Sequence, residues 1–481
     1  MILLIVWDGL RPDMVREETT PFLFEMAGRG VVCRASHCAF PTATRINSAS
    51  LTTGCYPRKH GIVDNELYVP ALDAERPISC ADWRALQAMA DAEGGRLVDA
   101  PTLGELLRDA GKQMVSVGSG SPGTTYLTNP TVTGPIVNWA VTWPENDETI
   151  AARLGGPLSA ESDSLARNAY VLQALTEELL PRWQPDLATV WLTEPDHAQH
   201  YHGLGSPEAL AALRALDEQL RHLVATAASL DDALTCFLLS DHGFDTIERV
   251  DAEPVDELRA AGLASSESPD VVRASNSLYL NGAARDRLEE IVAFLLERPW
   301  LGALWVRQDL RQRAPFLLPQ EAAFGGHRRS AELLLSFRWS DAANAVGVPG
   351  LMASPSSIVA THGSGSPYAL NNTLIAWGAG IKAGVVSDVP CGIVDVAPTA
   401  LHLLGLQPPR EMDGRVLGEV LKGGPNPDSV LVRRSVREAA YPCTQGRRIQ
   451  RIHYSHVACT DYIDRVTLSP PPTRDIERNE P

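Results

Sequence analysis

Continuous apolar runs that end in acidic residues or histidines are the strongest constraint that this sequence places on its fold. Ile2–Trp7 is apolar at every position and is followed directly by Asp8 and a glycine. Leu187–Leu192 runs into the letters TEPDHAQH, and Leu234–Leu239 runs into SDHG. A run without polar alternation is typical of a strand buried on both faces, as in a parallel sheet that helices cover.

Helical patterns separate these runs. Residues 164–183 and 207–227 have helical leucine and alanine spacing, and residues 20–30 and 102–111 have helical start and stop signals. Further strands are expected at 114–117 and 373–377. The alternation predicts an α/β fold, with a doubly wound, mostly parallel central sheet and helices on both faces.

The regularity of the pattern suggests how the chain is divided. Residues 1–243 and 356–424 are expected to form the catalytic core. Between them, residues 244–355 mix a helix with Gly- and Pro-containing segments, which indicates an inserted cap. Residues 425–481 are a polar C-terminal extension with strand-like pieces and a Pro-rich end.

Composition excludes several classes of protein. The formal net charge of −17 argues against binding to nucleic acid, because phosphate contacts need clustered Lys and Arg. The eight cysteines contain no CxxC pair and indicate free thiols in a reducing compartment. The apolar start is too short for a signal segment, and no later run is long enough to span a bilayer. We therefore expect a cytoplasmic protein without membrane association; a homo-oligomer is left open.

The segment from Phe40 to Ile62 contains a hydroxyl where a helix is expected to begin. It reads FPTATRINSASLTTGCYPRKHGI, with Gly54 as the stop signal. A hydroxyl at a helix N-terminus lies among unpaired N–H groups at the positive end of the dipole, which suits a phosphoryl group. Taken alone, Thr44 would be interpreted as an ordinary N-cap, and Thr42 is a weaker candidate nucleophile.

Acidic residues and histidines then gather at one predicted edge of the sheet. In open α/β sheets ligands bind outside the carboxyl ends of the strands. Carboxylates and imidazoles together suit zinc, and two such ions can clamp the attacking and leaving oxygens of an in-line displacement. The residues concerned are Asp8, the i,i+4 pair Asp196 and His200, the pair Asp241 and His242, and His362.

In order, spacing and residue type, these motifs resemble the alkaline phosphatase superfamily. DGLRPD, PTATRIN, EPDHAQH, SDHG and THG are most similar to the nucleotide pyrophosphatase/phosphodiesterase family, over about residues 1–245 and 356–415. The resemblance implies that Thr44 is the nucleophile and that Asn47 donates to a phosphoryl oxygen. It implies two Zn²⁺ ions, with Mn²⁺ as another option. One would be held by Asp196, His200 and His362, and the other by Asp8, Asp241, His242 and Thr44.

The resemblance implies a hydrolase of small anionic phosphate esters, with diesters favoured and a phosphothreonine intermediate. A phosphonate hydrolase similar to phosphonoacetate hydrolases, or a phosphomonoesterase, remains open as an alternative using the same site. A sulfatase is disfavoured because its Cys or Ser followed by x-Pro-x-Arg is absent. A scaffold kept only for binding is disfavoured because every expected ligand position and Thr44 are present.

The sequence departs from the family directly after the nucleophile. Arg45 and Ile46 stand where the family usually has an aromatic residue and a proline. The aromatic residue helps to sandwich a nucleobase, so the resemblance does not carry a preference for nucleotides to this chain. Arg45 is predicted to bind a second anionic group of the substrate. A surface salt bridge is the alternative interpretation.

Overall fold

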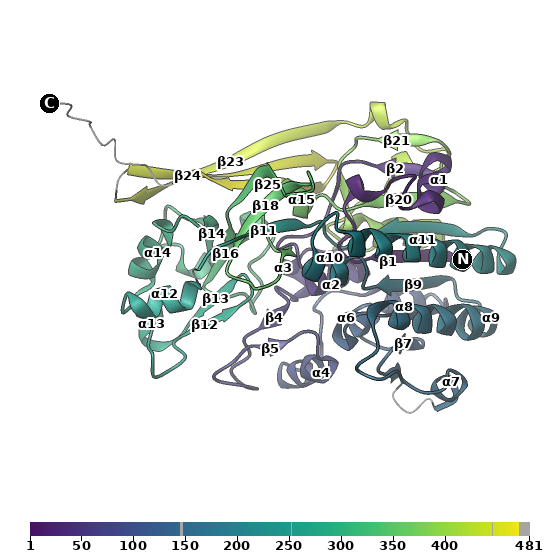
Figure 1. Ribbon diagram of the computed structural model, residues 1–481, viewed down its shortest axis with the longest axis horizontal. Helices are drawn as coiled ribbons and strands as arrows, with labels where there is room; N and C mark the ends of the chain where they lie inside the picture. The colour runs from purple at the N-terminus through teal and green to yellow at the C-terminus, as the bar shows by residue number, and fades with distance from the viewer. Residues whose placement is uncertain (145–147, 252, 445, 471–481) are drawn as a thin grey trace.

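A nine-stranded mixed sheet forms the centre of the molecule in the computed structural model, which describes residues 1–144, 148–251, 253–444 and 446–470 (Figure 1). The order is β21 (Val385–Ser387), β2 (Val31–Cys33), β20 (Leu374–Gly378), β10 (Thr235–Leu239), β1 (Ile2–Trp7), β9 (Leu187–Leu192), β6 (Met114–Gly118), β7 (Ile136–Asn138) and β8 (Thr142–Trp143).

Strand β1 lies between β9 and β10 and is parallel to both, and β6 and β7 continue the parallel arrangement. Strand β20 is antiparallel to both of its neighbours, and β8 is antiparallel to β7. The carboxyl ends of β1, β9 and β10 therefore meet at one edge. The predicted fold class, a mostly parallel sheet with helices on both faces, is confirmed.

Side chains of β1 alternate between two separate hydrophobic cores, which explains why the strand is apolar throughout. Leu3, Ile5 and Trp7 pack on one face with residues of α1, α8 and α11. Side chains at alternate positions pack on the other face with residues of α2, α5 and α16. The bounds are α1 Pro21–Arg29, α2 Thr44–Thr53, α5 Leu103–Asp109, α8 Ser164–Gln173, α11 Pro207–Leu230 and α16 Val396–Leu403.

Local signals account for several helix ends. The Thr102 side chain accepts from the Glu105 N–H, and the Glu105 side chain accepts from the Thr102 N–H. Helix α5 therefore begins with a capping box. Helix α2 ends at Gly54, whose φ of 64° is left-handed and strained for other residues. The long helix expected at 164–183 is α8 followed by a π-helical segment (Ala174–Leu179) and α9 (Leu180–Trp183).

Strands between residues 245 and 361 form two further sheets, on the left of Figure 1. One has the order β12-β13-β16-β14-β15 and the other β17-β18-β11-β19. Helices α12 (Pro254–Ala260), α13 (Gly282–Asp286) and α14 (Leu288–Leu296) accompany them. The strands are β11 Asp245–Arg249, β12 Val271–Ala274, β13 Ser277–Leu280, β14 Leu301–Val306, β15 Leu318–Pro319, β16 Leu333–Phe337, β17 Trp339–Ala343, β18 Pro349–Ser354 and β19 Ala360–Thr361.

The C-terminal extension forms a three-stranded antiparallel sheet of β23 (Val432–Cys443), β24 (Gly446–Val457) and β25 (Thr460–Leu468), yellow in Figure 1. Arg448 donates to the carbonyls of Leu296, Arg298 and Leu301. At the other end Tyr462 donates to the buried Asp395 of the core. The extension therefore joins the inserted region to the core. The division into core, cap and extension stays a prediction. Strand β19, from the predicted core, pairs with β11, from the predicted cap.

All eight cysteines are free in the structure, and six of them are buried. Among the described residues, no helix combines the length and the apolar character needed to cross a membrane.

Candidate metal centre

One cluster of possible metal ligands lies where β1 and β10 end side by side. Asp8 follows β1, and Asp241 and His242 follow β10; a ligand atom from each lies within 4.8 Å of the others. The His242 Nε2 atom is 3.2 Å from Asp241 Oδ2 and 3.5 Å from Asp8 Oδ1. Gly9 makes the turn possible: its φ is +71°, and a Cβ there would come within 2.9 Å of the Phe244 ring. We call this the buried cluster.

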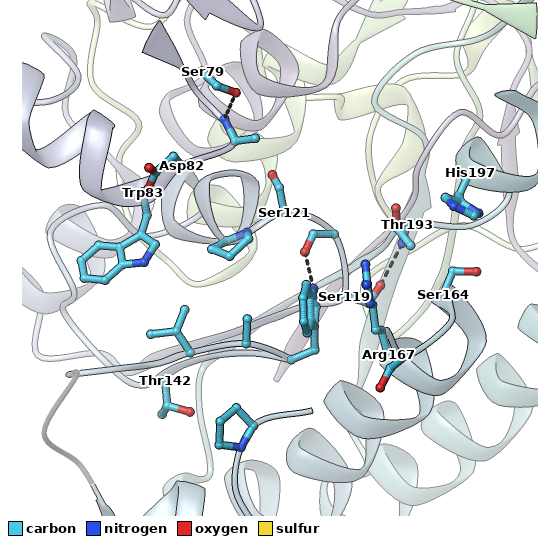
Figure 2. Close-up of a pocket in the computed structure, with 18 of the residues that line it drawn as sticks. Ser79, Asp82, Trp83, Ser119, Ser121, Thr142, Ser164, Arg167, Thr193 and His197 are labelled. Atoms are coloured by element: carbon cyan, nitrogen blue, oxygen red, sulfur yellow. Dashed lines mark hydrogen bonds between the residues drawn. The ribbon is translucent and has the colours of Figure 1, made fainter. Parts of the chain in front are cut away.

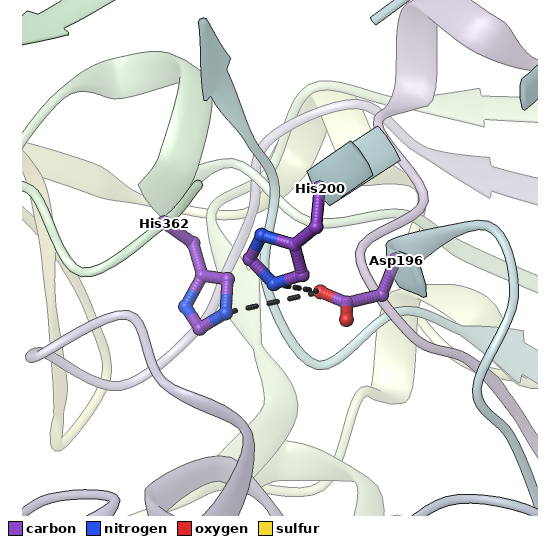
Figure 3. A group of neighbouring side chains, drawn as sticks. All are labelled: Asp196, His200 and His362. Atoms are coloured by element: carbon purple, nitrogen blue, oxygen red, sulfur yellow. Dashed lines mark ion pairs between the residues drawn. The ribbon is translucent and has the colours of Figure 1, made fainter. Parts of the chain in front are cut away.

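The second cluster combines Asp196, His200 and His362 (Figure 3). Asp196 and His200 lie one turn apart on α10 (Asp196–His202), so the predicted i,i+4 spacing does bring them to one face. Asp196 Oδ1 is 3.3 Å from His200 Nε2 and 3.8 Å from Nε2 of His362, which follows β19. We call this the open cluster, because its residues line a cavity.

The hydrogen bonds around both clusters leave the ligand atoms unused. Asp8 Oδ1, Asp196 Oδ1 and Asp241 Oδ2 are buried and have no hydrogen-bond partner among the described residues. The other oxygens of Asp8 and Asp241 accept from Trp191 Nε1 and the Gly9 N–H. Uncompensated buried carboxylate oxygens are costly, so these three atoms fit direct contact with cations.

The histidine rings of both clusters are also oriented by hydrogen bonds that leave a possible ligand atom unused. The Nδ1 atoms of His200, His242 and His362 lie 2.8, 2.9 and 2.7 Å from the carbonyl oxygens of Ala360, Gly243 and Thr42. Each Nδ1–H can therefore donate to the backbone, which leaves the Nε2 lone pair directed at a carboxylate. Metal-binding histidines use this arrangement to fix the ring and its tautomer. The residues present fit two divalent cations.

Thr44 lies between the clusters. The rings of His242 and His362, one from each cluster, stack with centroids 3.7 Å apart. Thr44 is the first residue of α2, and its Oγ1 atom is 3.3 Å from His242 Nε2. The structure thus brings the predicted nucleophile and all six predicted ligand residues together.

The charges in these clusters perturb each other strongly. Burial, with the neighbouring Asp241 carboxylate, raises the pKa of Asp8 well above its usual value, and burial also raises the pKa of Asp241. In the open cluster burial opposes ionisation, but the His200 and His362 rings hold the pKa of Asp196 below its usual value. Burial and the His242 ring lower the pKa of His362. Two facing carboxylates need positive charge to be ionised together, which a cation supplies.

Asn47 is placed differently from its predicted role. It is fully buried, and its Oδ1 accepts from the Ala39 N–H while its Nδ2 donates to the Ala39 and Ala43 carbonyls. With its amide used in this way, Asn47 positions the chain that precedes Thr44, and a phosphoryl oxygen could gain its N–H only by breaking these bonds. The cause is the helical spacing, because three residues after Thr44 the side chain points back into the turn before the helix.

Asn65, rather than Asn47, brings an amide side chain to the cavity beside Thr44. It lines the cavity of about 330 Å³ that also contains Thr44, Arg45 and the open cluster. Its Oδ1 accepts from the Arg45 N–H, so the amide is oriented, and its Nδ2 has no partner among the described residues. The preceding Asp64 is fully buried, and burial raises its pKa to about 7. The polar pair Asp64-Asn65, which follows the apolar residues Ile62 and Val63 in HGIVDNEL, was the available signal.

A second, larger cavity of about 870 Å³ lies beside this one (Figure 2). Its walls carry Ser119, Ser121, Thr193 and His197, and none of the six candidate ligands. The two cavities adjoin at Arg45, whose Nη2 donates to Ser121 Oγ. Thr44 and the open cluster therefore line the smaller cavity, and the larger one offers room beside it.

Comparison with known families agrees with this geometry. The family model described as "Type I phosphodiesterase / nucleotide pyrophosphatase" matches residues 2–341. The chain belongs to this family. The match extends well into the predicted cap, which the motifs did not reach, and ends before the segment that carries His362.

Curated relatives in the family include rat ectonucleotide pyrophosphatase/phosphodiesterase family member 1, 26% identical over 253 residues. A venom phosphodiesterase of Macrovipera lebetinus is 24% identical over 246 residues. Each match covers 50% of this chain but only 24% of the relative, so the chain matches about a quarter of those proteins' length.

Solved structures support the fold. Murine ectonucleotide pyrophosphatase/phosphodiesterase 5 matches with a TM-score of 0.59 at 17% identity, covering 85% of this chain and 96% of that structure. Wild-type alkaline phosphatase PafA matches with a TM-score of 0.65 at 17% identity, covering 87% and 98%. The fold is therefore alkaline-phosphatase-like, and the family is metal-dependent.

Proposed function

We propose that this protein is a two-metal hydrolase of phosphate esters that acts on phosphodiesters through a covalent intermediate on Thr44. The observation that carries the proposal is the set of unpartnered carboxylate oxygens that face three oriented imidazoles around one hydroxyl. The mixture of oxygen and nitrogen ligands favours zinc, with Mn²⁺ as the alternative. Bound cations would lower the pKa of the hydroxyl and offset the charge that develops on the leaving oxygen.

The chain's own residues would perform the following steps. Thr44 Oγ1 gives its proton to solvent and attacks phosphorus; the bond to the leaving oxygen breaks as the Oγ1–P bond forms, and the departing alkoxide takes up a proton from water. Water then gives up a proton and attacks the same phosphorus from the vacated side, and the Oγ1–P bond breaks as Oγ1 takes up a proton, which restores the threonine. Asn65 Nδ2 donates to a non-bridging oxygen, and the first turn of α2 adds its N–H groups and dipole.

The two adjoining cavities offer enough space for a phosphodiester substrate. The cavity at Thr44 is compact and polar, whereas the larger neighbouring cavity begins at Ser121, next to Arg45. We propose that one esterified group of the substrate extends into the larger cavity. A phosphonate hydrolase or a phosphomonoesterase remains the second candidate. Arg45 favours it, because a half-buried guanidinium with no acidic partner in the described part of the chain suits a small substrate with additional negative charge.

One rate comparison separates these functions. With zinc present, kcat/KM is measured for an aryl phosphodiester, an aryl phosphomonoester and a phosphonate with the same leaving group. We expect the diester to be hydrolysed fastest and all turnover to stop after chelation. A faster monoester or phosphonate would support the second candidate, and full activity of the metal-free protein would refute both. A cytoplasmic location also stays a proposal, to be tested by cell fractionation.

A further inference from the structure

The cavity at Thr44 has a second wall, built by the inserted region. The hairpin of β12 and β13 turns at Ser275 and Asn276, and Arg273, Ser275 and Asn276 line the same cavity as Thr44 and Arg45. No sequence motif pointed to this hairpin, which lies more than two hundred residues from the nucleophile.

The hairpin is fixed to the catalytic core by side chains at both edges of the cavity. Asp64 Oδ2 accepts from the Asn276 N–H at 3.0 Å and from Ser277 Oγ at 3.1 Å. The next residue, Asn65, accepts from the Arg45 N–H at 3.0 Å. Asn276 Nδ2 also donates to the carbonyl of Gly363, directly after His362. The hairpin therefore has a set position relative to the first turn of α2.

Arg45 brings a positive charge to this cavity without an acidic partner. No ion pair involving Arg45 occurs in the part of the chain that the structure describes. Its Nη2 donates to the neutral Ser121 hydroxyl, and its Nε is buried and unpartnered. A surface salt bridge, the alternative interpretation of this arginine, is not formed.

Arg273 is held in place while part of its guanidinium stays available. Its Nη1 donates to Glu253, its Nε donates to the Ser275 carbonyl, and its guanidinium lies 5.4 Å from the centre of the Phe337 ring. Glu253 does not line the cavity. Nη2 has no hydrogen-bond partner among the described residues. A preorganised guanidinium binds an oxyanion without losing much side-chain freedom.

We infer that the substrate carries a second anionic group, a carboxylate or a phosphate, which binds between Arg45 of the core and Arg273 of the inserted hairpin. The inference rests on the proposed function and narrows its substrate class. The candidate cations would engage the reacting phosphoryl group, so two further guanidiniums at the same cavity suit a charge elsewhere on the substrate. The inserted region would thereby contribute directly to specificity.

The test uses two aryl phosphodiesters that differ only at the end of the second ester group, one ending in a carboxylate and the other in a carboxamide. Arg45→Gln and Arg273→Gln should each lower kcat/KM for the carboxylate substrate about ten- to hundredfold and change the carboxamide substrate less than about threefold. Arg259→Gln is the matched control, because Arg259 pairs with Asp256 on α12 outside the cavity. It should change neither rate.

The inference would be overturned if both variants lost kcat/KM equally on the two substrates. It would also be overturned if the variants kept the wild-type ratio of kcat/KM between the carboxylate and carboxamide substrates. If the wild-type protein hydrolyses neither substrate, the proposed function fails separately. Calorimetry with zinc-loaded protein and the corresponding alkyl phosphonates then decides the inference. Tighter binding of the carboxylate form that is lost in Arg273→Gln supports it, and equal binding of both forms refutes it.

Discussion

The two clusters contain the same kinds of ligand in different surroundings. In the buried cluster the exposed fractions of the side chains are 6% for Asp8 and 0% for Asp241 and His242. In the open cluster they are 14% for Asp196, 18% for His200 and 10% for His362. Only the open cluster lines the cavity, whereas His242 of the buried cluster contacts the Thr44 hydroxyl. We therefore propose different roles for the two clusters. The ion of the buried cluster would activate the Thr44 hydroxyl, and the ion of the open cluster would contact the leaving group and water.

The largest effect is expected at the residue between the clusters. Thr44→Ala should lower the hydrolysis rate by about three orders of magnitude or more, because the covalent step is lost, while both ions remain bound. Steady-state rates and elemental analysis measure this. Thr42→Ala is the control: Thr42 accepts from the Gly363 N–H and donates to the Ser364 carbonyl, so it should cost only about 1–2 kcal/mol of stability. The reverse order of rate losses would mean that the nucleophile is Thr42.

The second prediction separates the clusters by metal count. Asp241→Ala should remove the ion of the buried cluster, and Asp196→Ala should remove the ion of the open cluster, because each change takes one of the three Asp and His ligands of its cluster. Elemental analysis should fall from two ions per chain to one in each variant, and to none in the double variant. Two ions retained in every variant would show that other residues bind them.

The third prediction concerns pH. Protons compete with metal at a ligand, so the apparent metal affinity falls as pH falls below the ligand's metal-free pKa. The pKa values of Asp8 and Asp241 are raised, mainly by burial, whereas that of Asp196 is lowered by its histidines despite its burial. Burial lowers the pKa of His200, but the Asp196 carboxylate raises it overall, so a proton on His200 competes with metal in the open cluster. Acidification should therefore weaken metal binding at both clusters, through Asp8 and Asp241 in the buried cluster and through His200 in the open cluster. Equilibrium dialysis of the Asp241→Ala and Asp196→Ala proteins measures each cluster separately; metal binding that stays unchanged from about pH 8 to about pH 4 would contradict the assigned ligands.

The smallest effect is expected at a side chain that contacts only one cluster. Trp191 Nε1 donates to Asp8 Oδ2 at 3.0 Å, whereas the hydrogen bonds that orient the open cluster's rings go to backbone carbonyls. Trp191→Phe should weaken metal binding at the buried cluster about ten- to hundredfold and leave the open cluster unchanged. Trp305→Phe is the control, because Trp305 is fully buried and its Nε1 has no partner. Equal weakening in both variants would indicate a packing effect alone.

Much of the core could be predicted from sequence because its signals are local. Ile2–Trp7 and Leu187–Leu192 were predicted as strands with the bounds that the structure gives them. Parallel neighbours bring the residues after such strands to one edge, so Asp8 and Asp241 could be paired before their geometry was known. The spacing of Asp196 and His200 was equally informative.

What sequence could not show depends on contacts between distant segments. Asn47 and Asn65 are the same residue type, and the sequence does not distinguish their roles. Only the fold shows that the Asn47 amide bonds to the backbone and that Asn65 lines the cavity. Arg273 reaches the cavity through a hairpin whose position depends on Asp64. Strand β20 follows an apolar pattern that is compatible with either direction, and its antiparallel pairing had no local signal.

The stereochemistry at phosphorus tests the central claim most directly. A chiral phosphorothioate diester is hydrolysed in ¹⁸O-labelled water with metal present, and the configuration of the product is determined. Two successive in-line displacements, first by Thr44 and then by water, predict net retention of configuration. Net inversion would mean that water attacks the substrate directly, and it would contradict a covalent role for Thr44.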